Sequence, residues 1–136
     1  MADGFKILAQ AVLLSSDPAT VPLADSAGCL IYQVPAASAD RFNSRDYSQA
    51  VISSIVVCHV DSSAATHPYT IRVVKSGSGF DDKQYVVYNK DLAASDTDVL
   101  SLGIGLVSGD AIYAQSYKNA SATSDLSISI FGTEVV

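Results

Sequence analysis

The chain has 136 residues, which suits one domain, since single domains cluster at about 100–150 residues. Hydrophobic residues make up 49 % of the sequence and charged residues 16 %, and 14 acidic against 8 basic side chains give a formal net charge of −6. An acidic chain is a poor ligand for phosphate backbones, and no apolar run reaches the ~20 residues that span a bilayer, so neither nucleic acid nor a membrane is expected as a partner.

The low charge content has two interpretations. Ordinary soluble domains contain roughly 25 % charged residues. A chain with fewer charges and many small side chains can bury part of its surface in an assembly. It can equally be a compact β domain whose solvent-exposed surface carries few charges. The apolar stretch from Ile7 to Leu14 is interrupted by Gln10 and has no basic leader, so no secretory signal is expected.

Eight segments are predicted as β-strands. In each of them β-branched or other apolar residues dominate or alternate with small and polar ones, and no ten-residue stretch has an apolar period of 3.6 residues. Turn residues separate the segments at short intervals. In chain order the predicted strands cover residues 5–14, 30–34, 50–60, 69–74, 84–88, 100–106, 111–116 and 126–130.

This pattern predicts an all-β fold in a single domain over residues 1–136, an antiparallel β-sandwich of about eight strands of the jelly-roll or immunoglobulin-like kind. An immunoglobulin domain proper is disfavoured, because the sequence has no Trp and because Cys29 and Cys58 are too close together for the usual bridge between sheets. The two cysteines have the local pattern of small buried apolar residues, and a disulfide between them is the less favoured alternative.

An irregular polar loop over residues 36–49 follows the second strand, which Pro35 ends because proline cannot donate into a sheet ladder. Arg and aromatic side chains anchor many protein interfaces, so this loop is the candidate interface. A solvated surface excursion is the favoured interpretation of the loop, and the contact loop is the functional alternative. The residues proposed to make the contact are Arg41, Phe42, Arg45 and Tyr47.

The segment 50–60 is the strongest strand prediction, and we expect it to be central, with both faces covered. Simple alternation places Ile52 and Val56 on one face and Ile55 and Val57 on the other. The segment 69–74 is expected to be half-buried and to pair with this central strand.

The segment 100–106 alternates large apolar residues with Ser or Gly. This gives one apolar face and one nearly bare face, where Gly103 and Gly105 would let another backbone approach closely. The two glycines could instead mark a bend that divides the strand into two pieces. The segment 111–116 is expected to be an edge strand.

Catalytic signatures are missing from the sequence, and we expect no enzymatic activity and no cofactor. Gly77-Ser78-Gly79 is a short flexible loop and not a nucleophile elbow. His59 and His67 could meet across the turn between their strands and form a metal trio with Asp61, but hydrogen-bonded surface or rim histidines are the favoured interpretation. The clustered aspartates are expected to cap turns, and no metal site is predicted.

Several segments together resemble a group of small all-β structural proteins of tailed bacteriophages, over about two-thirds of the chain. The shared patterns are packing and turn patterns. In the family the Val-Pro-Ala turn leads almost directly into the central strand, whereas residues 37–49 intervene here. The segments that carry the resemblance are Tyr32 to Ala36, Val51 to Cys58, Ser95 to Thr97, Leu102 to Leu106, Asp125 to Ser127 and Phe131 to Glu134.

The resemblance implies a non-enzymatic virion component assembled in the host cytoplasm. A head decoration (cement) protein bound to the major capsid protein is the favoured role, and a neck, tail or fibre component is the alternative. We expect a homo-oligomer, with a trimer as the favoured state. A soluble carbohydrate-binding β-sandwich is the competing class, with Tyr85, Tyr88, Tyr113 or Tyr117 as stacking platforms for sugars.

Overall fold

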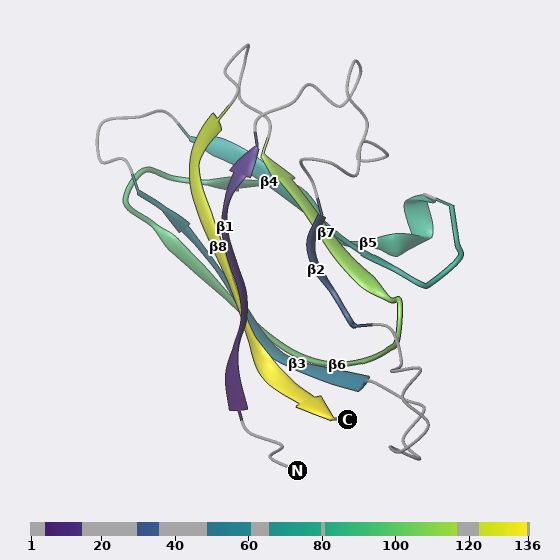
Figure 1. Cartoon of the computed structure of the whole chain (residues 1–136). Coiled ribbons are helices and arrows are strands. Elements are labelled where there is room, and N and C mark those ends of the chain that lie inside the picture. Colours follow the sequence, from purple (N-terminus) through teal and green to yellow (C-terminus); the bar gives the residue numbers. More distant parts are fainter. Residues whose placement is uncertain are drawn as a thin grey trace, which may run out of the picture.

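The computed structural model describes residues 5–14, 30–35, 49–60, 66–79, 81–116 and 123–135. These residues form eight β-strands and one short 3₁₀ helix, η1, at Asp82–Gln84, with no α-helix among them (Figure 1). The strands are β1 at Phe5–Leu14, β2 at Leu30–Gln33, β3 at Gln49–His59, β4 at His67–Val74, β5 at Tyr85–Leu92, β6 at Thr97–Val107, β7 at Ala111–Ser116 and β8 at Thr123–Val135.

The strands form two four-stranded antiparallel sheets in a β-sandwich-like arrangement. Sheet A has the order β1-β8-β3-β6, and sheet B has the order β2-β7-β4-β5. The pairing is nested, because β1 pairs with β8, β2 with β7, β3 with β6 and β4 with β5. Strands from the two ends of the chain therefore lie side by side in sheet A (Figure 1).

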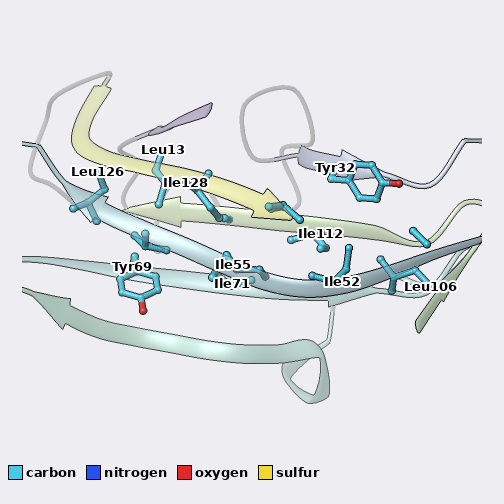
Figure 2. Close-up of a cluster of buried hydrophobic side chains, with 14 of the residues drawn as sticks. Leu13, Tyr32, Ile52, Ile55, Tyr69, Ile71, Leu106, Ile112, Leu126 and Ile128 are labelled. Atoms are coloured by element: carbon cyan, nitrogen blue, oxygen red, sulfur yellow. The ribbon is translucent and has the colours of Figure 1, made fainter. Parts of the chain in front are cut away.

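The hydrophobic core lies between the two sheets, and both contribute to one buried cluster. Figure 2 shows Ile52 and Ile55 of sheet A and Tyr69 and Ile71 of sheet B among its members. All four side chains are fully buried. Burial of one Ile side chain stabilises the fold by about 1.5–3 kcal/mol, so this cluster supplies much of the free energy that holds the sheets together.

A β-bulge in β3 corrects the predicted faces of this strand. Ile52 and Ile55 are three residues apart, yet both are buried, because the register with β8 shifts between Ile52 and Ser54. Val57 therefore faces the core with them, whereas Val56 lies on the outer face and is only partly covered. The expectation that both faces of β3 are covered is wrong, since Val51 on the outer face is 48 % exposed.

Two predicted strand positions also change. β3 is central as expected, but its neighbours are β8 and β6, and β4 pairs with β5 and β7 in the other sheet. β7 lies between β2 and β4 and is not an edge strand. β6 is one continuous strand, which confirms the predicted single strand over its alternative of a bend at Gly103 and Gly105. Alternation within one strand contains no information on which strand lies beside it, and this is why the predictions for β4 and β7 failed.

Candidate functional site

The outer face of sheet A is the candidate functional surface. Nine large hydrophobic side chains are exposed in the described part of the chain, and five of them lie on this face. None of its outward-facing residues with a described side chain is charged. The five are Phe5, Ile7, Val51, Val99 and Val107.

Strand register arranges this face in rows that run from one edge of the sheet to the other. The first row contains Phe5 of β1, Thr133 of β8, Val51 of β3 and Gly105 of β6. The bulky end of the row lies on β1 and the bare end on β6.

The second row repeats this gradient of side-chain size. It contains Ile7, Phe131, Ser54 and Ser101 in the same strand order. The rings of Phe5 and Phe131 stack with centroids 6.4 Å apart, so the bulky side forms a continuous apolar ridge.

The bare side of the face is open. A Cβ atom placed on Gly103 or Gly105 would have no neighbouring atom within 4 Å. The sequence predicted a bare face of β6, and the structure places this face on the outside of sheet A. Prediction missed the ridge on β1, because a bulge between Ile7 and Ala9 turns Phe5 and Ile7 outward while Leu13 points into the core.

The predicted interface residues Arg41, Phe42, Arg45 and Tyr47 lie outside the described residues, so their role stays a prediction. Their segment leaves β2 in sheet B and enters β3 in sheet A. The two residues that precede this segment are held against the β6–β7 turn: the Val34 amide donates to the Asp110 carbonyl at 2.9 Å, and the Ser108 hydroxyl donates to the Pro35 carbonyl at 3.0 Å.

Tyr69, Asp98 and Lys90 form a polar contact between the sheets. The Tyr69 hydroxyl of β4 donates to the Asp98 carboxylate of β6 at 2.7 Å, and the Lys90 ammonium of β5 lies 2.9 Å from the same carboxylate. Burial alone would raise the pKa of Asp98, but the hydrogen bonds from Lys90 and Tyr69 outweigh it and hold the pKa below its usual value. Burial and the bond to Asp98 raise the pKa of Tyr69.

A second contact between the sheets involves Tyr32 and Glu134. The Tyr32 hydroxyl of β2 donates to the Glu134 carboxylate of β8 at 2.9 Å, and Lys6 of β1 lies 3.5 Å from that carboxylate. Burial and the hydrogen bond to Glu134 raise the pKa of Tyr32, so this phenol stays neutral and continues to donate. Both contacts lie between the sheets, where they fix how one sheet sits on the other.

His59 and His67 do meet, as the sequence allowed. Their rings stack with centroids 5.0 Å apart and an angle of 16° between the planes. Both side chains are buried, which corrects the expectation of surface or rim histidines. Asp61 lies outside the described residues, and the residues that are described contain no group of three or more metal ligands. The pair packs between the sheets, since His59 ends β3 and His67 begins β4.

The tyrosines proposed as sugar platforms are only partly available. Tyr85 and Tyr88 form an edge-to-face pair with centroids 4.8 Å apart, and the Arg72 guanidinium lies 4.3 Å from the centre of the Tyr85 ring. One face of Tyr85 is therefore occupied, while Tyr88 is 65 % exposed. Tyr113 is half-buried on β7, and Tyr117 lies outside the described residues.

Turn capping by aspartates is confirmed at three positions. Asp96 accepts a bond from the Thr97 amide at 2.8 Å, and Asp81 accepts one from the Lys83 amide at 3.2 Å. The Asp110 carboxylate accepts bonds from the amides of Ser76 and Val107. Asp98 differs, because it joins the sheets as described above. Cys58 is a free thiol, and Cys29 lies outside the described residues.

Compared with known proteins, the chain matches no family model and no curated protein. Within the described ranges no helix is long and apolar enough to cross a membrane.

Proposed function

We propose that this chain is a non-enzymatic structural protein of a tailed-bacteriophage virion, a head decoration (cement) protein that binds the major capsid protein as a homo-oligomer. The observation that carries the proposal is the outer face of sheet A, where the described side chains include five exposed large hydrophobic residues and no charge, in a chain with a net charge of −6. Such a face is typical of a surface that another protein covers.

The nested strand pairing supports the jelly-roll alternative over the immunoglobulin-like one. A jelly roll has eight strands in two four-stranded sheets, and viral capsid proteins, lectins and cupins use it. In immunoglobulin domains consecutive strands such as A and B pair within one sheet. Here β1 pairs with β8, and β2 belongs to the other sheet. The fold alone does not assign a function. The reason for proposing a virion role for this jelly roll is the resemblance of the sequence to phage structural proteins.

A cement protein needs the properties described above. It binds at many lattice points and gains stability from contact area, with no cofactor. A neutral contact between the copies of its homo-oligomer keeps its affinity when the salt concentration changes, because screening acts only on charges. The polar pairs Tyr69–Asp98 and Tyr32–Glu134 lie between the sheets, where they stabilise packing.

Mass spectrometry of particles purified from the source culture tests this proposal. We expect the protein in the particles at a copy number comparable to that of the major shell protein. A handful of copies per particle would contradict the decoration role and favour the neck, tail or fibres. Absence from particles that contain the shell protein would overturn the virion assignment.

The exposed Tyr88 ring, edge-to-face with Tyr85, favours a carbohydrate-binding module as the second candidate. A glycan array separates the two candidates. Saturable binding that Tyr88→Ala abolishes would support the module, whereas the decoration role predicts no such binding.

A further inference from the structure

We infer that a second copy of this chain covers the outer face of sheet A, with the two A sheets packed face to face about a two-fold axis parallel to the strands. This inference deepens the proposed function and rests on its homo-oligomer, because it names a second copy of the chain as the protein that covers this face; contact with the capsid then uses another part of the surface.

Charge is the first argument for a second copy. Two copies that each carry a charge of −6 repel one another, so they associate where the charge density is lowest. The ion pairs Lys6–Glu134 and Lys90–Asp98 belong to the inward-facing rows of the sandwich. The described outward-facing side chains of sheet A have no charge, so like-charged copies can meet there without repulsion between opposed residues.

Shape is the second argument, because this face is complementary to itself. A two-fold axis between β8 and β3 places β1 of one copy over β6 of the other, and β8 over β3. Each register row then lies over its own equivalent. In the first row Phe5 faces the open position at Gly105 of the second copy.

The second row has the same complementarity. Ile7 faces Ser101 of the second copy, and Phe131 faces Ser54. Packed sheets cross at about 30°, which moves the outer strands by about one residue, and the open positions at Gly103 and Gly105 accommodate this movement. Each contact between a bulky side chain of one copy and a Gly or Ser position of the other occurs twice in the dimer, as the two-fold symmetry of an isologous contact requires.

Area is the third argument. Four strands spaced about 4.8 Å apart, each with about ten residues at about 3.3 Å per residue, give a face of about 600 Å² in projection. Side-chain relief makes the accessible area larger than the projected one. A standard interface buries about 800 Å² on each partner, so one sheet face is large enough for a specific dimer. An isologous contact closes at two copies, and we therefore infer a dimer in place of the trimer that the sequence suggested.

Sedimentation velocity over a concentration series tests the inference, with Gly105→Lys as the disrupting variant. Since the Gly105 position is open, the lysine fits in the monomer, but it fills the space that Phe5 of the second copy needs. The dimer dissociation constant should rise at least about tenfold, while circular dichroism and the melting temperature stay close to those of the unmodified chain.

Val86→Lys on β5 is the matched control, since it adds the same charge to an exposed apolar position of sheet B. It should dimerise like the unmodified protein. Exchanging the side-chain sizes at positions 5 and 105 should restore the dimer. Phe5→Ala alone weakens the dimer, and Phe5→Ala combined with Gly105→Phe brings the dissociation constant back toward that of the unmodified chain.

Three results would overturn the inference. The first is an unmodified chain that stays monomeric at every concentration or sediments as a trimer. The second is a Gly105→Lys protein that dimerises normally. The third is a Val86→Lys protein that dissociates to the same extent as Gly105→Lys. None of these results bears on whether the protein is found in virions.

Discussion

Asp98 connects three strands through one carboxylate. It belongs to β6 of sheet A, and its partners Tyr69 and Lys90 belong to β4 and β5 of sheet B. Charge-assisted hydrogen bonds are about twice as strong as neutral ones, and a partly buried carboxylate with two donors is well satisfied. The sequence shows Asp98 only as one member of an acidic turn, so its role between the sheets could not be predicted.

This arrangement predicts a pH effect on stability. Because the pKa of Asp98 is lower in the folded state than its ordinary value of 3.8, the carboxylate stabilises the fold above that value, and this stability is lost as the pH falls through the folded pKa. Asp98→Asn keeps an acceptor for Tyr69 but does not titrate. Urea denaturation between pH 2 and 7 should therefore show a smaller acid-induced loss for Asp98→Asn than for the unmodified chain.

Asp91→Asn is the control for this measurement. Asp91 is exposed on β5, next to Lys90 in the sequence, and its substitution removes a carboxylate of the same kind. Its acid profile should follow that of the unmodified chain. If Asp98→Asn also followed that profile, the hydrogen bonds of Asp98 would not contribute to stability.

Gly132 lies where β8 approaches the bulged part of β3 closely. A Cβ atom at this position would collide with the carbonyl oxygen of Val51, which is backbone and cannot rotate away, and would press on the Leu8 side chain. Gly132 pairs with Ile52, the residue at which the β3 register shifts. The glycine is needed for close approach between strands.

Gly132→Ala should therefore destabilise the protein by about 1–3 kcal/mol, the usual cost of overpacking. Gly103→Ala is the matched control, because its Cβ meets open space, and it should change the free energy of unfolding by less than about 0.5 kcal/mol. Urea denaturation of both variants makes the comparison. Equal losses would mean that strand propensity, and not the contact with Val51, governs the effect.

The strands were predictable from the sequence, but their faces and neighbours were only partly so. β-branched content, alternation and turn residues together located all eight strands, yet each bulge reverses the faces that alternation predicts beyond it. The bulge in β3 brings Ile52 and Ile55 to the same side, and the bulge in β1 turns Ile7 away from the core. Both depend on contacts with β8, a strand distant in the sequence.

The candidate surface was predictable to the same limited extent. The bare face of β6 was predicted, because Gly103 and Gly105 alternate with Leu and Ile within one short segment of the sequence. The ridge of Phe5 and Phe131 could not be found, since the two rings come from opposite ends of the chain. The predicted contact loop rests on Arg41 and Arg45, which lie outside the described residues.

At the scale of the whole molecule, a neutral interface predicts weak salt dependence. If the dimer forms through the outer face of sheet A, its dissociation constant should change less than about threefold between about 0.05 and 0.5 M NaCl. Sedimentation at the two salt concentrations measures this. A dimer that dissociates strongly in high salt would instead depend on ion pairs and would require a charged surface elsewhere.

The nested pairing also constrains how the chain folds during synthesis. Lys6 and Glu134 are 128 residues apart in sequence and belong to paired strands. β1 therefore leaves the ribosome long before its partner exists, and at about 5–20 residues per second it waits several seconds or more with its strand unpaired and Leu13, which the finished fold buries, uncovered. Sheet A cannot close until β8 has been made, which places its completion late and makes this chain a slow folder for its size.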